Sequence, residues 1–208
     1  MSSSKAGGRD PFPETTPFFR TPLQMRILAK VLLDPHISTT AELGAFAGAA
    51  RHSAYDEVAR LQKQGVVRTE KQGRNVLVYN NLKYPVLEAV TTLLIRAAGP
   101  VVLAPELFKD VTGVDEIYIV GSWAARYTAH QGPAPADIDI LLVGDLPYPA
   151  EANRAADALM RRLDLGLQVQ ILTATSEKWN NPENTFFADM QSRPKIDLTA
   201  ELKRVKAL

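Results

Sequence analysis

The chain has 208 residues, of which 46% are hydrophobic and 23% charged, with a formal net charge of +1. This composition is close to the globular average and excludes extended disorder, a collagen-like repeat and a coiled-coil rod. The lack of cysteine excludes a disulfide framework, a cysteine-liganded zinc site and a thiol nucleophile. The apolar stretches fall short of the roughly 20 residues that cross a bilayer, and the N-terminus has no apolar signal core. We therefore expect a cytoplasmic protein with no membrane span.

The near-neutral total hides an uneven distribution of charge. Residues 1–85 contain 12 Lys+Arg and 7 Asp+Glu, a net of +5, whereas residues 86–208 contain 12 and 16, a net of −4. Such asymmetry indicates two modules with different partners, a basic one suited to nucleic acid and an acidic one suited to cations. The expected segments are a flexible arm over 1–20, a first domain over 21–83, a connecting helix over 84–100 and a second domain over 101–208.

The first domain has the sequence pattern of three helices followed by a hairpin. Thr21 and Pro22 form a typical helix start, and Thr39 with Glu42 three residues later fits a capping box. Glycine closes the third helix and sits at the hairpin tip. In chain order, we expect helices that end at Asp34-Pro35, at Gly44–Gly48 and at Gly65, then strands over 66–70 and 75–79.

Helix, helix, helix, hairpin is the element order of a winged helix-turn-helix. In that motif the second helix of the pair places its N-terminal residues against base edges in the major groove. Arginine and serine suit guanine edges and phosphates, and a basic hairpin tip suits phosphates or the minor groove. The candidate DNA-binding residues are Arg51, His52, Ser53 and Tyr55 at the start of the third helix and Lys71 and Arg74 at the tip. The alternative is a module for protein interaction or dimerisation.

Residues 21–83 resemble winged-helix transcriptional regulators of the arsenic-repressor type. The resemblance depends on the segment from Thr39 to Gly65, on the helix exit Leu61–Val67 and on Gly73 in the hairpin tip. It implies double-stranded DNA as a partner. It also implies a homodimer, because two-fold DNA sites need two reading heads. The apolar helix over 84–98 is then the candidate dimer or hinge element.

The second half alternates helical and strand-like segments, which is typical of an α/β sheet domain. Gly99-Pro100 is expected to end the connecting helix. The expected elements after it are a short helix over 103–108, a strand over 116–120, a helix over 123–128, a strand over 138–143, a helix over 150–163, a strand over 167–173 and a helix near 198–205. The fold class is therefore α/β (α+β), with an N-terminal winged helix-turn-helix followed by a mixed-sheet domain.

Two short motifs in this half point to phosphate and metal chemistry. Asp137 and Asp139 are two apart on a predicted strand, so their carboxylates share one side. Carboxylates this close repel unless a cation lies between them, and hard oxygen ligands favour Mg²⁺ or Mn²⁺. Gly121-Ser122 follows a strand and opens a helix, where the backbone N–H groups attract phosphate. Together the motifs predict a metal–nucleotide site.

This arrangement resembles the minimal polymerase-β-type nucleotidyltransferases over roughly residues 110–175. Gly121, Ser122, Asp137 and Asp139 match the family motif in type, order and spacing, and many minimal members carry an arginine where Arg126 stands. The resemblance implies catalytic roles for Ser122, Asp137 and Asp139, nucleotide binding by Gly121, Ser122 and Arg126, metal binding by Asp137 and Asp139, and a nucleoside triphosphate as ligand or substrate.

One position departs from the family pattern. A third carboxylate is expected on the later strand, where this chain has Gln168 and Gln170 on one face. A glutamine can neither act as a general base nor bind a second metal as a carboxylate does. The first functional hypothesis is therefore a DNA-binding regulator whose second domain binds metal–nucleotide with weakened catalysis.

Two alternatives remain open at this point. One is an active nucleotidyltransferase that moves a nucleoside monophosphate onto a protein, an RNA or a small molecule, as similar minimal transferases do in toxin–antitoxin pairs. The other is a scaffold protein with neither activity.

Overall fold

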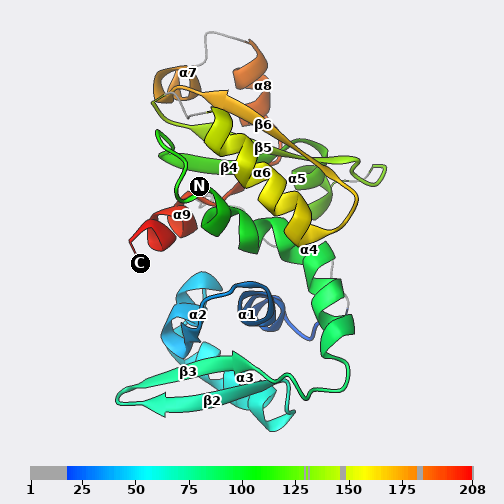
Figure 1. Ribbon diagram of the computed structural model, residues 1–208, viewed down its shortest axis with the longest axis vertical. Coiled ribbons are helices and arrows are strands. Elements are labelled where there is room, and N and C mark those ends of the chain that lie inside the picture. The colour runs from blue at the N-terminus through cyan, green and yellow to red at the C-terminus, as the bar shows by residue number, and fades with distance from the viewer. Residues whose placement is uncertain (1–17, 129, 131, 146–148, 182–184, 208) are drawn as a thin grey trace, which may run out of the picture.

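The computed structural model describes residues 18–128, 130, 132–145, 149–181 and 185–207. They form a mixed α/β structure with two sheets. Figure 1 shows an N-terminal module (residues 18–86) and a C-terminal module (residues 87–207) at opposite ends of the long axis. The expected arm over residues 1–20 lies outside the described residues, apart from residues 18–20.

The N-terminal module contains the three predicted helices and the hairpin. Thr21 accepts a hydrogen bond from the backbone of Gln24 with proline at the first helical position, and the capping box of Thr39 and Glu42 is present. A two-residue strand that the sequence did not predict pairs with the hairpin and gives the sheet order β1-β3-β2. The elements are α1 (Pro22–Leu33), β1 (Ser38–Thr39), α2 (Thr40–Phe46), α3 (Arg51–Lys63), β2 (Val67–Gln72) and β3 (Asn75–Asn80).

Gly44 does not break the second helix, contrary to expectation. It lies inside α2, where a side chain would press on Ala54 of α3, so the glycine permits close packing of the two helices. Gly48 has a φ of +63° and follows the helix end, as expected.

The connecting helix also differs from the prediction. A single helix, α4 (Leu87–Phe108), continues through Gly99, Pro100 and Pro105. A proline inside a helix removes one backbone hydrogen bond, but residues 97–105 are buried, and that burial offsets the loss. A side chain at Gly99 would overlap Leu163, so this glycine marks a close helix contact and not a helix end.

Because α4 is continuous, its apolar segment is longer than the sequence predicts. With 22 residues and a mean hydropathy of 1.6 in its most apolar window, α4 is long and apolar enough to cross a membrane by length and composition. The expectation that every apolar stretch is too short is therefore wrong for this helix. Half of that window is buried inside the protein, as is common for a core helix.

The C-terminal module has a four-stranded mixed sheet in the order β6-β5-β4-β7. Strands β5 and β6 are parallel, and the other pairs are antiparallel. Its elements after α4 are β4 (Glu116–Val120), α5 (Gly121–Tyr127), β5 (Asp137–Val143), α6 (Pro149–Leu163), β6 (Gln168–Ala174), α7 (Ser176–Asn180), α8 (Thr185–Ser192), β7 (Ile196–Asp197) and α9 (Thr199–Lys206).

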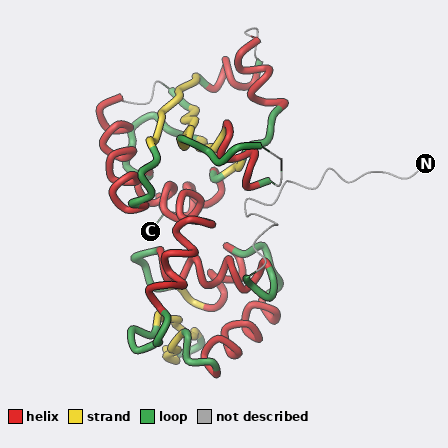
Figure 2. Tube along the Cα trace, turned by 90° about the vertical axis from the view of Figure 1, so that its right-hand side faces the viewer, coloured by secondary structure: helices red, strands yellow, loops and turns green. Residues whose placement is uncertain are grey.

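Both faces of this sheet are covered, and Figure 2 shows its strands between helices. Along β5, Ile138, Ile140 and Leu142 belong to the larger apolar core with α4 and α6. The alternate residues Leu141 and Val143 pack in a smaller cluster that includes Trp179 of α7. The larger core is continuous from α1 of the N-terminal module into the C-terminal module.

Candidate functional site

The two aspartates lie at the start of β5, on the face that the smaller cluster covers further along the strand. Because side chains alternate along a strand, Asp137 and Asp139 share a face with Leu141 and Val143. Leu141 and Val143 are buried, whereas the aspartates are only half-buried. The carboxylates therefore stand together at the open end of an otherwise apolar surface, as the sequence predicts.

Gly121 lies directly against this pair. Val120 is opposite Asp139 in the antiparallel register, and the chain turns at Gly121 with a φ of +72° into α5. A β-carbon at position 121 would overlap Oδ2 of Asp139. Glycine is therefore required at position 121 for two reasons: the backbone is left-handed, and the Asp139 carboxylate occupies the space of a β-carbon.

Ser122 is exposed beside Gly121 and does not cap the helix. The N-cap position of α5 is Val120, which has no side-chain hydrogen bond to the helix end. Ser122 is thus an exposed residue next to Gly121, which itself lies against Asp139.

Gln170 occupies the position next to the aspartates on the parallel strand β6. Its backbone is opposite Asp139 in the register, and its Nε2–H donates a 2.9 Å hydrogen bond to Oδ2 of Asp137. Gln168 is opposite Asp137 and is exposed on the same face. The neutral amide predicted at this strand is therefore in direct contact with the candidate metal ligands, a contact that the sequence does not reveal.

The electrostatics of the pair favour a bound cation. Burial, followed by the charge of Asp137, raises the pKa of Asp139 above its ordinary value. Either a proton or a metal ion would relieve this repulsion. Across the part of the chain that the structure describes, no three His, Cys, Asp or Glu side chains form a metal-binding group. Two carboxylates fit one Mg²⁺ or Mn²⁺, which keeps water or phosphate oxygens as its other ligands.

Arg126 is on the same helix as Ser122, but its contact is elsewhere. Its Nη1 donates a 2.6 Å hydrogen bond to the backbone oxygen of His130, and its guanidinium lies against Gly132. The structure thus joins Arg126 to the loop after α5, whereas Gly121, Asp137, Asp139 and Gln170 come together.

The candidate DNA-binding residues of the N-terminal module are all at the surface. Arg51, His52 and Ser53 are exposed at the start of α3, and Tyr55 is 55% exposed. His52 lies 3.3 Å from Asp56, one turn along the helix. Lys71 and Arg74 are exposed at the hairpin tip, and Gly73 has the left-handed φ of +59° that the tight turn requires.

The outward stripe of α3 is longer than the sequence prediction. The helical repeat starting at His52 and Tyr55 continues into four further exposed residues, which the prediction left out because it stopped at the first turn. Counting the repeat along the whole helix would have found them. These residues are Asp56, Ala59, Gln62 and Lys63.

A buried carboxylate on the inner face of α3 forms ion pairs that anchor this helix. Glu57 is 2% exposed and pairs with Arg60 of the same helix and with Arg20, which precedes α1. Buried charges are retained when they are paired, so this cluster fixes the inner face of α3 while its outer face stays open.

Neither a protein-family model nor a curated protein matches this chain.

Proposed function

We propose that the protein is a cytoplasmic, DNA-binding transcriptional regulator with a nucleotidyltransferase-like domain that binds a metal–nucleotide complex. The observation that carries this proposal is the exposed start of α3 together with the basic hairpin tip. Arg51, His52 and Ser53 are exposed to solvent, and Lys71 and Arg74 extend the same polar, basic surface to the tip. A helix start and a wing that are both basic and exposed suit a groove contact and a backbone contact with duplex DNA.

The aspartate site supports binding more than turnover. Asp137 and Asp139 would hold Mg²⁺ or Mn²⁺, which neutralises and positions the phosphates of a nucleoside triphosphate. Ser122 and the exposed backbone at Gly121 would receive a phosphate oxygen. Gln170 stands where a carboxylate would accept the proton of an attacking hydroxyl, and its amide cannot do so. The weakened catalysis expected from the sequence is therefore part of the proposal.

A homodimer completes the DNA-reading unit in this proposal. Leu82 and Val86 are 75% and 50% exposed just before α4, and Leu87, Val90 and Leu93 are only half-buried on its first turns. A second copy that covers this apolar segment would present two α3 helices to a two-fold DNA site. Analytical ultracentrifugation that shows a monomer at micromolar concentration would remove the dimer from the proposal.

The direct test is fluorescence anisotropy with duplex DNA from the region upstream of the protein's own gene. Arg51→Ala and Arg74→Ala should each weaken binding at least fivefold. Arg161→Ala, an exposed arginine on α6, is the matched control and should bind like the parent. Tight binding that survives both substitutions would contradict the assignment of α3 and the hairpin tip.

The second candidate function is an active nucleotidyltransferase, which the close contact between Gly121 and Asp139 favours. Its test is incubation with Mg²⁺ and α-³²P-labelled nucleoside triphosphates in the presence of candidate protein and RNA acceptors. Label transfer that disappears with Asp137→Asn would support turnover. Nucleotide binding without any transfer would favour the regulator.

A further inference from the structure

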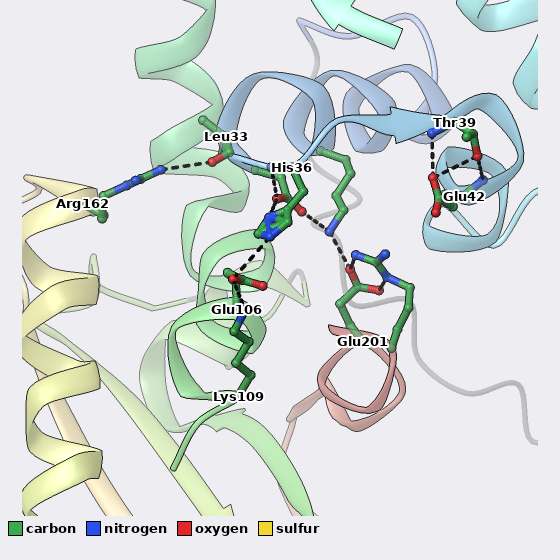
Figure 3. Close-up of polar contacts among 11 residues, drawn as sticks. Leu33, His36, Thr39, Glu42, Glu106, Lys109, Arg162 and Glu201 are labelled. Carbon is green, nitrogen blue, oxygen red and sulfur yellow. Dashed lines mark hydrogen bonds and ion pairs between the residues drawn. The ribbon is translucent and has the colours of Figure 1, made fainter. Parts of the chain in front are cut away.

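The two modules meet at a cluster of four charged side chains, the interdomain ion cluster, formed by Lys30 and Asp34 at the end of α1 and Glu201 and Arg204 of α9. Lys30 Nζ pairs with Asp34 and lies 2.6 Å from Oε1 of Glu201. Arg204 donates two hydrogen bonds to Glu201, at 2.8 and 3.0 Å. Figure 3 shows Glu201 on its helix facing the N-terminal module.

The burial of Lys30 makes this contact specific. The lysine is only 2% exposed, and Asp34 and Glu201 are also largely covered. A buried ammonium needs partners in defined directions, and removal of one partner leaves an uncompensated charge. The apolar contacts between the modules are non-directional, whereas this ion cluster forms at one orientation of the modules.

A second set of contacts continues from the ion cluster around the end of α1, since Nδ1 of His36 lies 3.3 Å from Oδ1 of Asp34. The segment after α1 approaches α4 and α6, where Nε2 of His36 is 3.6 Å from Glu106 and Nη2 of Arg162 donates a 3.4 Å hydrogen bond to the oxygen of Leu33. Figure 3 shows these contacts from the C-terminal module to the end of α1. The end of α1 and the segment after it are thus held to the C-terminal module by one connected polar network, which reaches α9 through Glu201 and α4 through Glu106.

Helix α9 is tied to the strand that ends at the aspartate site. Strand β7, just before α9, pairs with β4 through Ile196 and Asp197. Ile117 of β4 accepts a hydrogen bond from the backbone of Leu198 and donates one to the hydroxyl of Thr199 at the start of α9. The other end of β4 leads into Gly121 against Asp139. The backbone is therefore hydrogen-bonded continuously from the aspartate site to the helix that carries Glu201.

We propose that the interdomain ion cluster locks the orientation of the N-terminal module, and that through this lock the occupancy of the aspartate site controls DNA binding. The lock depends only on the contacts described above. The control depends on the proposed function. Ligand binding that shifts β4 and α9 changes the position of Glu201 relative to Lys30, and an ion pair has little tolerance for such a shift.

The lock is tested without any ligand. Because the chain has no cysteine, two spin labels can be attached at exposed positions, one in each module, with Gln64→Cys and Asn153→Cys. Electron–electron double resonance should give a single narrow distance distribution in the parent and a broadened one in Glu201→Gln. The matched control variant is Asp189→Asn on α8, which removes an exposed ion pair with Arg193 and should leave the distribution narrow. An unchanged distribution in Glu201→Gln overturns the lock.

A second variant covers the case in which Glu201→Gln does not fold. Lys30→Met, Asp34→Asn and Glu201→Met together remove the three buried charges of the cluster, and Arg204, whose side chain is 26% exposed, keeps its access to water. This triple variant should fold and still show the broadened distribution. A narrow distribution here would show that apolar packing alone sets the orientation.

The proposed effect of the aspartate site on DNA binding is tested by measuring DNA affinity with and without Mn²⁺ and α,β-methylene-ATP. The parent should change its DNA dissociation constant at least fivefold on adding this probe, and Glu201→Gln should lose that response while it still binds the probe by calorimetry. If the parent binds both DNA and the probe, and its DNA dissociation constant does not change, the proposed effect of the aspartate site on DNA binding is overturned. A parent that binds neither DNA nor the probe contradicts the proposed function, and the spin-label result still decides the lock.

Discussion

The carboxylate of Asp139 lies so close to the backbone of Gly121 that no other residue fits at position 121. This contact joins the end of β4 to the start of β5, the two strands that carry the motifs found in the sequence. The two motifs, which lie 16 residues apart in the sequence, are thus brought into contact by Gly121 and Asp139.

Gly121→Ala should lower both stability and metal affinity. Alanine at a left-handed φ costs about 1 kcal/mol, and the overlap with Asp139 adds about 2 kcal/mol more because the carboxylate must move. Urea denaturation and Mn²⁺ calorimetry measure the two effects. Gly166→Ala is the matched control, since Gly166 has a φ of +69° in the same module with open space around it. Equal losses in both variants would show that the contact with Asp139 is unimportant.

Gln170→Glu should make the stability of the protein depend on a cation bound at the aspartate site, whereas the parent is stable without one. The change replaces the hydrogen bond to Asp137 with a third negative charge beside two others. Without metal the variant should melt at a lower temperature than the parent, and Mn²⁺ should raise its melting temperature more than it raises the parent's. Gln168→Glu adds the same charge two residues away and should respond less. An equal response in both glutamate variants would mean that Gln170 has no special place at the site.

Two residues of the N-terminal surface should differ in how they affect DNA binding. Arg74→Ala removes a contact with the DNA phosphate backbone. It should therefore weaken binding to all duplexes alike and reduce the slope of log affinity against log salt concentration by about 0.9. Arg51→Ala removes a side chain suited to guanine edges at the start of α3, and it should cost about 1–3 kcal/mol more on the target sequence than on random DNA. Salt titrations on specific and random duplexes separate the two. A loss of sequence discrimination with Arg74→Ala and not with Arg51→Ala would reverse the assignments.

The interdomain ion cluster should appear in the pH dependence of unfolding. Burial alone raises the pKa of Glu201, but the hydrogen bonds from Arg204 and the charge of Lys30 outweigh it, so the net pKa is lowered. A lowered folded-state pKa adds stability above the unfolded carboxyl pKa of about 4.3, and this stability is lost as pH falls through the folded value. Glu201→Gln should therefore be less stable than the parent at pH 7, and the difference should shrink below pH about 4. A difference that stays constant from pH 7 to acid would show that ionised Glu201 is not the stabilising species.

Local signals in the sequence predicted the helix starts well. The caps at Thr21 and Thr39 depend on neighbours three residues away, and both are formed. The alternation of Asp137 and Asp139 with isoleucine also fixed their common face, because strand geometry is local. What could be predicted here is what a few adjacent residues determine.

Contacts between distant segments were not predictable in the same way. Gly99 and Pro100 look like a helix end, but Leu163 of α6 packs onto the glycine and the helix continues. The hydrogen bond from Gln170 to Asp137 depends on the register of two strands 33 residues apart. The hydrogen bond from Arg126 to the backbone oxygen of His130 depends on the path of the loop after α5. Each is a tertiary contact that local propensity does not encode.

The continuous helix α4 ties the two modules into one folding unit. Its 22 residues correspond to a rod of about 33 Å at 1.5 Å per residue, and the apolar core around it runs from α1 into the C-terminal module. Because one core joins them, the two modules should unfold together in a single cooperative transition.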